Sequence, residues 1–268
     1  MDDQKVSKQI IAVKELNYTD VKESPYFYWN VAVLPWGSIE PHGEHLSYMT
    51  DTLLAHSIAY GAVKKASIEY NNRFIILPSI SMGQQNLGQV NKKFCINYSL
   101  ETISCVLYDT VKSLSENGIN KLVIINGHNG NDFKPIVRDL ATEFPEFRIY
   151  VCNYLSIVEE NKNCDELKEI PFTKIDDHAA FTETSLMQFY YPQFTFMNNL
   201  KTEYEVPFVT LGNRKEIEGV WSPRNFDKAS INTRIGDVGF ASGVHGAKIA
   251  EFVTDKLSMC LIKIYEQD

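Results

Sequence analysis

Four short apolar runs, separated by stretches of helical periodicity, constrain the fold more than any other feature of the chain. The runs are rich in β-branched residues and occupy residues 27–36, 73–80, 121–127 and 148–154. Continuous apolar runs of this length are typical of strands covered on both faces, as in parallel sheets. They predict four strands of one parallel sheet.

Segments with helical character lie between and after these runs. They span residues 51–70, 100–117, about 132–144 and about 243–265. Three of them carry apolar residues at steps of three and four, and Gly118 predicts the C-terminal end of the second. Alternating strands and helices imply right-handed crossovers. The predicted fold is α/β, with a mostly parallel, Rossmann-like sheet flanked by helices.

The chain length fits a single domain. With 268 residues, it suffices for one large α/β domain over residues 1–268 and is short for two. Residues from about 155 to 240 are predicted to be a loop-rich excursion, which we expect to form a lid or a subunit contact. Three aromatic residues of this region could cover a binding site: Trp221, Phe226 and Phe240.

Charge and cysteine content narrow the range of partners. The net charge is −8 and no segment is rich in lysine and arginine, which disfavours nucleic acid and anionic membranes as partners. No apolar stretch approaches the roughly 18 residues of a membrane span, and the polar start lacks the apolar core of a secretory signal, so we expect a cytoplasmic protein. The five cysteines are widely spaced without a CxxC pair, so most are predicted to be buried thiols.

Polar residues gather directly after three of the predicted strands. "GSIEPHGEHLSYMTD" (37–51) follows the first, "SMGQQNLG" (81–88) the second, and "NGHNGND" (126–132) the third. In an open parallel sheet, ligands bind outside the carboxyl ends of the strands, where the connecting loops converge. The three clusters therefore predict one site at one edge of the sheet.

The residue types in these clusters favour a metal site. Glu40 and His42 share a face of an extended segment, Asp51 begins a predicted helix, His128 follows the third strand, and Glu183 could supply a fifth ligand. Carboxylates and imidazoles together suit zinc, manganese or iron(II), whereas they offer too few oxygens for a calcium cage. Five ligands with an aspartate able to bridge suffice for two ions roughly 3.5 Å apart that share a water ionised near neutral pH.

A structural role is the competing interpretation for any single histidine. Four of the six histidines nevertheless fall within acidic, glycine-containing loops: His42, His45, His128 and His178. Chance clustering is the weaker explanation for the four together. His56 lies inside a predicted helix and His245 near the start of another, so we expect structural roles for these two.

Three segments of the sequence resemble the motifs of a known family. "LPWGSIEPHGEHLSYMTDTLLA" (34–55) resembles the signature of the creatininase, or creatinine amidohydrolase, family, "INGHNGN" (125–131) its second motif and "HAAFTETSLM" (178–187) its third. A weaker similarity is found in "GDVGFASGVHG" (236–246). The resemblance spans most of the chain in order, and the first motif is long enough to be specific.

The resemblance implies a hydrolase of non-peptide or unusual C–N bonds, with a binuclear metal centre and assembly as a homohexamer. By position, Glu40, His42, Asp51 and His128 match metal ligands, with Asp51 as the bridging carboxylate. His178 matches a residue that shuttles a proton. A bridging hydroxide would attack the amide carbon, a metal would stabilise the oxyanion, and the histidine would protonate the leaving nitrogen.

Two departures from the family pattern bear on the substrate. Creatininase proper has a glutamate ligand of the second metal where this chain has Gly130, and Glu183 is our expected replacement. An alternative role for Glu183 is that of an acid stabilising a helix N-terminus. The segment after the second strand also offers neutral amides where the family often has charge: Gln84, Gln85, Asn86 and Asn97. Creatinine is therefore not the expected substrate.

The sequence thus favours a metal-dependent amidohydrolase acting on a small polar amide, formamide or lactam, with His178 and Glu183 as catalytic residues and zinc, manganese or iron(II) as the metal. A non-catalytic small-molecule binder or scaffold of the same family is the main alternative. A metallophosphoesterase is disfavoured because residues 37–51 and 125–132 contain no lysine or arginine. A phosphate-binding loop is a further interpretation of "NGHNGND", but this segment lacks the lysine of a P-loop.

Overall fold

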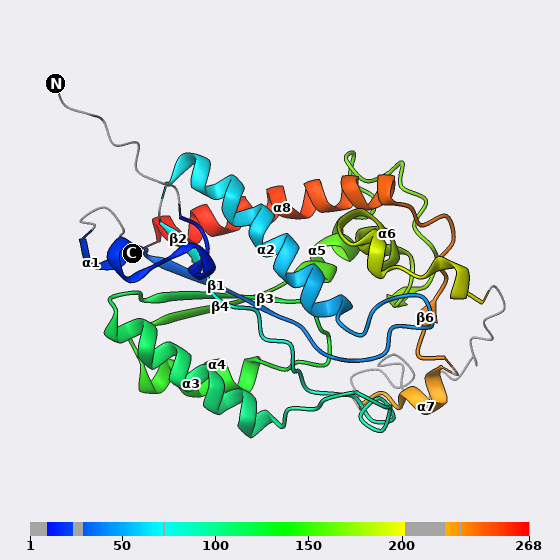
Figure 1. The fold of residues 1–268 in the computed structure, drawn as a ribbon, viewed down its shortest axis with the longest axis horizontal. Coiled ribbons are helices and arrows are strands. Elements are labelled where there is room, and N and C mark those ends of the chain that lie inside the picture. Colours follow the sequence, from blue (N-terminus) through cyan, green and yellow to red (C-terminus); the bar gives the residue numbers. More distant parts are fainter. Residues whose placement is uncertain (1–9, 24–28, 72, 202–222, 231, 268) are drawn as a thin grey trace.

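A four-stranded, all-parallel sheet forms the centre of the molecule (Figure 1). The computed structural model describes residues 10–23, 29–71, 73–201, 223–230 and 232–267. The strand order is β2-β1-β3-β4, which confirms the predicted parallel α/β fold. The strands are β1 (Val31–Trp36), β2 (Phe74–Ile76), β3 (Lys121–Asn126) and β4 (Arg148–Asn153).

Helices cover both faces of this sheet. Figure 1 shows α2 and α8 along one face and α3 and α4 along the other, and α6 packs against α8. Their bounds are α2 (Thr50–Glu69), α3 (Leu100–Glu116), α4 (Lys134–Glu143), α6 (Phe181–Tyr190) and α8 (Gly243–Glu266). The remaining helices of the described residues are short: η1 (Val13–Glu15), α1 (Tyr18–Glu23), α5 (Tyr154–Asn161), η2 (Pro192–Phe194), η3 (Met197–Asn199) and α7 (Phe226–Ala229).

The apolar run of β1 is explained by two separate cores. Val31 and Val33 pack with residues of α2 and α8, whereas Ala32, Leu34 and Trp36 pack with residues of α3 and α4. All five side chains are buried, because alternate residues of a strand point to opposite faces of the sheet. A strand covered on both faces needs apolar residues at every position, as the sequence indicated.

The second strand is shorter than predicted. The sequence pattern favoured a strand over residues 73–80, but β2 ends at Ile76 and only an isolated bridge joins Ile80 to Trp36. Pro78 explains the interruption, because proline has no backbone N–H to donate to a neighbouring strand. The first strand begins at Val31 rather than at residue 27; residues 27 and 28 lie outside the described part of the chain.

Two helix ends are capped in different ways, one by a local glycine and the other by a side chain distant in sequence. Gly118 adopts a φ of 75° after α3 and its N–H donates to Ser115 O at 3.0 Å, which confirms the predicted cap. The buried Lys121 at the start of β3 donates through Nζ to the carbonyls of Ile264 (3.0 Å) and Tyr265 (3.2 Å) at the end of α8. This cap fixes the end of the last helix to the central sheet.

The described part of the region from 155 to 240 contains more regular structure than a loop-rich excursion. It includes α5, the largely buried α6, and a two-stranded antiparallel sheet of β5 (Asp176–His178) and β6 (Ile235–Gly236). Residues 202–222, with Trp221, lie outside the described residues. Of the other two aromatic candidates for a cover, Phe226 is buried against His178, whereas Phe240 is 81% exposed.

The prediction that most cysteines are buried is wrong. Cys105 and Cys260 are exposed and Cys95, Cys152 and Cys164 are intermediate; all five are free thiols. Cys105 and Cys260 lie on the outward faces of α3 and α8, where helical periodicity rather than residue type decides exposure. Among the described residues, no helix combines the length and the apolar character that crossing a membrane requires.

Candidate metal centre

Six titratable side chains meet in the buried space outside the carboxyl end of the sheet. Glu40 and His42 come from the segment after β1, Asp51 from the first turn of α2, His128 from the segment after β3, His178 from the end of β5 and Glu183 from the first turn of α6. All six are buried. The crossovers of a parallel sheet bring these sequence-distant residues to one edge.

His42 has its two ring nitrogens in different environments. Nδ1 lies 3.0 Å from the carbonyl oxygen of Glu40. A carbonyl oxygen can only accept a hydrogen bond, so Nδ1 carries the hydrogen. Nε2 lies 2.9 Å from Asp51 Oδ1 and 3.9 Å from Glu183 Oε1. The lone pair of the neutral ring therefore points at two carboxylates.

His128 repeats this arrangement with the two nitrogens exchanged. Nε2 donates to the carbonyl of Gln84 at 2.8 Å. Nδ1 lies 3.0 Å from Glu40 Oε1 and 3.1 Å from Asp51 Oδ2. Asp51 thus presents one carboxylate oxygen to each of two histidines.

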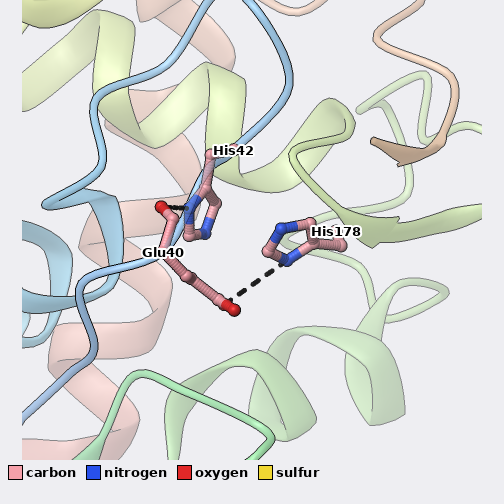
Figure 2. A group of neighbouring side chains, drawn as sticks. All are labelled: Glu40, His42 and His178. Atoms are coloured by element: carbon pink, nitrogen blue, oxygen red, sulfur yellow. Dashed lines mark hydrogen bonds and ion pairs between the residues drawn. The ribbon is translucent and has the colours of Figure 1, made fainter. Parts of the chain in front are cut away.

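His178 lies beside His42, with the ring centroids 4.2 Å apart (Figure 2). Its Nε2 lies 3.1 Å from the carbonyl oxygen of Pro41, so the hydrogen is on Nε2. Its Nδ1 lies 3.8 Å from Glu40 Oε1 and is free to accept a proton. The next residue, Ala179, has a positive φ of 51°.

The two carboxylate oxygens of Glu183 have different contacts. Its Oε2 accepts a hydrogen bond from the backbone N–H of Ala179 at 2.6 Å, just before α6 begins. Its Oε1 is the atom that faces His42. One carboxylate oxygen therefore stabilises the local backbone while the other remains available to the cluster.

Three overlapping groups of these side chains could each hold a cation, and two of the groups share Asp51. Glu40, Asp51 and His128 offer ligand atoms within 4.8 Å of one another, and so do His42, Asp51 and Glu183. A third such group consists of Glu40, His42 and His178. Neutral imidazole lone pairs aimed at carboxylate oxygens repel each other unless a cation lies between them, so the donor set fits divalent metal ions.

Without a metal, protons take the place of the cation. Burial lowers the pKa of His42, but the carboxylates of Asp51, Glu183 and Glu40 outweigh it and raise the pKa to about 10. Burial likewise opposes the charged form of His128, and Glu40 and Asp51 raise its pKa well above the usual range. Metal binding at these residues is therefore coupled to proton release.

The pKa values of His178 and Glu183 shift mainly because these side chains are buried. Burial and the neighbouring His42 lower the pKa of His178, which leaves this ring neutral at neutral pH. Burial raises the pKa of Glu183 to about 8 despite the attraction of His42. Such pairs, with a carboxyl pKa above and an imidazole pKa below the usual value, are common in functional sites.

The position of Gly130 is closed to a side chain. A Cβ atom at Gly130 would overlap with His128 Nε2 and with the Gln84 carbonyl oxygen. These two atoms form the hydrogen bond that orients His128. Gly130, at the position where we expected creatininase proper to have a glutamate, therefore leaves room for the hydrogen bond that holds His128.

Other polar residues singled out in the sequence have supporting roles. His56 bonds to Ser79 and His245 to Ser242, and neither belongs to a metal-binding group of the described residues. Asn97 Oδ1 accepts from the backbone N–H of Gln85 at 2.8 Å, which shapes the segment after β2. His45 Nε2 lies 2.9 Å from the Thr184 hydroxyl oxygen, next to the cluster but outside it.

Sequence reasoning missed Gln89. This residue lies in the segment flagged for its amides, yet only Gln84, Gln85, Asn86 and Asn97 stood out there. Gln89 is fully buried and donates through Nε2 to Glu40 Oε2 at 2.9 Å. No spacing rule distinguishes it from the other amides, because its contact depends on the path of the loop.

The fold and the cluster together define a class: an α/β protein with a buried carboxylate and imidazole cluster, of the kind that binds metals, at the carboxyl ends of a parallel sheet. Residues 14–261 match the family model described as creatininase, creatinine amidohydrolase. The chain therefore belongs to the creatininase family of amidohydrolases, as the motifs indicated.

Individual relatives agree with this assignment. The creatinine amidohydrolase of Pseudomonas putida is 26% identical over 183 residues, covering 63% of this chain and 68% of the relative. A mycofactocin precursor peptide peptidase of Mycobacterium ulcerans is 24% identical over 238 residues, covering 86% and 84%. A Bacteroides fragilis structure that carries the provisional name creatinine amidohydrolase has a TM-score of 0.86 at 32% identity, covering 97% and 98%.

Structures of creatininase itself share the fold at lower identity. A Zn-Zn type of a creatininase point mutant and a form with Mn each have a TM-score of 0.76 at 18% identity. They cover 96% of this chain and 99% and 100% of their own chains.

Proposed function

We propose that this protein is a metal-dependent hydrolase that cleaves a C–N bond in a small amide, formamide or lactam. Two divalent ions would occupy the neighbouring positions that share Asp51. The observation that carries the proposal is a pattern of contacts shared by His42, His128 and His178. In each ring, one nitrogen bonds to a backbone carbonyl and the other faces carboxylate oxygens. Such second contacts are typical of metal-ligating histidines, whose tautomer they fix.

Each residue has a distinct role in this proposal. Glu40, Asp51 and His128 would hold one ion, and His42, Asp51 and Glu183 the other. When bound, divalent ions supply a Lewis acid for the amide carbonyl and lower the pKa of a water molecule. His178, with its unprotonated Nδ1 directed at Glu40 Oε1, is placed to accept a proton and to deliver it to the leaving nitrogen.

Glu183 would be both a ligand and a catalytic residue. In the metal-free protein burial raises its pKa to about 8, so metal binding at Oε1 would displace a proton, while Oε2 stays bonded to the Ala179 N–H. Zinc is our first choice for the metal, with manganese or iron(II) as alternatives, since mixed carboxylate and imidazole sites accept all three. The Zn-Zn and Mn forms of creatininase support this choice.

The substrate class rests on observations separate from the metal site. Gly130 closes the position at which creatininase proper has a ligand, which argues for a substrate other than creatinine. The relative described as a peptidase supports a peptide-derived amide as a second candidate. An activity screen should therefore include formamides, cyclic amides and short peptides, with aryl phosphates to test a phosphoesterase.

Asp51→Ala is the test of the metal proposal. We expect about two equivalents of metal in the wild-type protein, purified without chelators and measured by elemental analysis, and loss of both ions and of hydrolysis in the variant. Asp109→Ala, at an exposed position of α3, is the matched control and should retain both ions. Full metal content in Asp51→Ala contradicts the shared ligand, and a metal-free wild type favours a non-catalytic binder.

A further inference from the structure

Gln89 contacts residues of the cluster, but the proposed chemistry assigns this side chain no role. Its side chain is fully buried, and Nε2 lies 2.9 Å from Glu40 Oε2, 3.4 Å from the Pro41 carbonyl oxygen and 3.5 Å from His178 Nε2. The amide therefore lies between the carboxylate of one metal group and the histidine assigned to proton transfer. A neutral side chain thus contacts both.

Chemistry fixes which end of the amide faces Glu40. A carboxylate accepts hydrogen bonds only, so the nitrogen faces it, and a flipped amide would place two oxygens together. The two hydrogens of Nε2 then go to Glu40 Oε2 and to the carbonyl of Pro41. His178 Nε2 donates to the same carbonyl, so the 3.5 Å approach of the two nitrogens reflects a common acceptor.

The backbone around Gln89 is built for this approach. Gly88 has a φ of 85°, and a Cβ atom there would lie 2.6 Å from the backbone nitrogen of Asp227. Against the same segment, Leu87 O accepts from Phe226 N at 2.8 Å and Lys92 pairs with Asp227 at 2.7 Å. The turn is thus held against α7, and it directs Gln89 inward.

The amide is retained at a cost. Gln89 Oε1 is buried and has no hydrogen-bond partner in the described part of the chain. A methionine or leucine of similar size would pack in the same space without this penalty. A side chain that only filled space would not need to be an amide, so the donor function of Nε2 is the reason for its presence.

We propose that Gln89 is a positioning residue of the metal site. By holding Glu40 Oε2, it turns Glu40 Oε1 toward His128 Nδ1, which lies 3.0 Å away, and so toward the first ion. Through the Pro41 carbonyl it also holds the acceptor that orients His178. The inference rests on the proposed metal-dependent function, because it assigns Gln89 a role in one of the two ion positions.

Gln89→Met tests this role by metal binding rather than by activity. Zn²⁺ affinity is measured by competition with a chelator of known affinity, and Co²⁺ absorption spectra report the ligand geometry. Loss of a hydrogen bond to a ligating carboxylate typically weakens metal binding about 10- to 100-fold. We expect a loss of about tenfold or more for one ion only, with an altered Co²⁺ spectrum.

The matched control is Gln188→Met. Gln188 lies on α6 and donates to the Ala241 carbonyl at 3.3 Å, away from the cluster contacts. We expect wild-type affinities and spectra for this control. Gln89→Asn is the second variant, because it keeps an amide but is too short to reach Glu40, and it should weaken the same ion as Gln89→Met.

The outcomes separate this inference from the proposed function. Two ions bound by Gln89→Met with wild-type affinity and an unchanged spectrum would overturn the positioning role while leaving the metal site in place. Equal weakening of both ions would also contradict it, because Gln89 bonds to Glu40, which is proposed as a ligand of the first ion alone. Absence of metal binding in the wild type and in Gln188→Met would refute the proposed function itself.

Discussion

The two helix layers differ in what they bury against the sheet. Helices α3 and α4 bury only apolar side chains, namely Ile103, Leu107, Val111, Leu114, Ile136 and Leu140. Helices α2 and α6 bury Asp51 and Glu183 in their first turns, beside apolar residues such as Leu54. Helices α2 and α6 can hold charged groups rigidly because each packs against α8 and against further elements of the fold.

This comparison explains why the site lies on one side of the sheet. A helix with a single buried stripe, such as α3, leaves its N-terminal turn partly in water. The N-terminal turns of α2 and α6 are buried, so their carboxylates lose hydration and interact strongly with nearby imidazoles. We infer that α2 and α6 are the functional layer and that α3 and α4 chiefly stabilise the fold.

Matched core truncations should separate the two layers. Leu54→Ala in α2 and Leu107→Ala in α3 each remove a fully buried leucine, and each should lower the free energy of unfolding by about 2 to 5 kcal/mol. Only Leu54→Ala should also weaken Zn²⁺ binding, because Leu54 lies one turn from Asp51. Urea unfolding of the metal-free proteins and Zn²⁺ titration check the two effects, and equal metal affinity in both variants would remove the functional distinction.

His45, which contacts the functional layer through the Thr184 hydroxyl of α6 at 2.9 Å, should make the stability of the protein pH-sensitive. Burial, together with Arg234 and His42, lowers the pKa of His45 to about 4 from 6.5. A depressed histidine pKa means that the unfolded chain binds the proton more readily, so stability is present above pH 6.5 and is lost as the pH falls toward 4. At about 1.4 kcal/mol per pKa unit, the loss is on the order of 3 kcal/mol.

Replacement of His45 by glutamine tests this effect. The free energy of unfolding, measured with a chelator present at pH 6.5 and pH 4.5, should fall less in His45→Gln than in the wild type. Leu107→Ala is the control from the other layer and should lose as much as the wild type between these two values. A slope in His45→Gln equal to that of the wild type would assign the pH sensitivity to other groups.

The smallest expected effect concerns a phenol that packs in the same core cluster as residues of α2 and α6. Tyr154 is fully buried and its hydroxyl has no hydrogen-bond partner in the described part of the chain. Tyr154→Phe should therefore raise the free energy of unfolding by about 1 kcal/mol, since it removes an unpaired buried hydroxyl. Tyr150→Phe is the matched control, because that hydroxyl bonds to Gln267 at 3.0 Å and its loss should be neutral or slightly destabilising. Urea unfolding of both variants measures the difference, and a clear loss of stability in Tyr154→Phe would reveal a partner for the hydroxyl.

Much of the central fold was predictable from the sequence. The apolar runs located three of the four strands nearly to the residue at their carboxyl ends, because doubly covered strands need apolar residues throughout. Short elements were not predictable in the same way. The strands β5 and β6 have three and two residues, too few to show periodicity, and the polar residues of α6 hide a buried helix.

The site was predictable in part for a similar reason. Glu40, His42 and Asp51 lie within one motif, and His128 follows a clear strand, so strand order alone brings them together. Lys121 and Gln89 gave no such signal, because their partners depend on the packing of distant segments. The roles of the site residues, a homo-oligomeric state and a cytoplasmic location stay predictions.

The crowded space around Gly130 limits how this chain could evolve. A single change of Gly130 to glutamate would force His128 away from the Gln84 carbonyl before the new carboxylate could bind anything. The loop bearing Gln84 would have to shift in the same step. A glutamate at this position would thus need coupled changes in the two loops that carry Gly130 and Gln84.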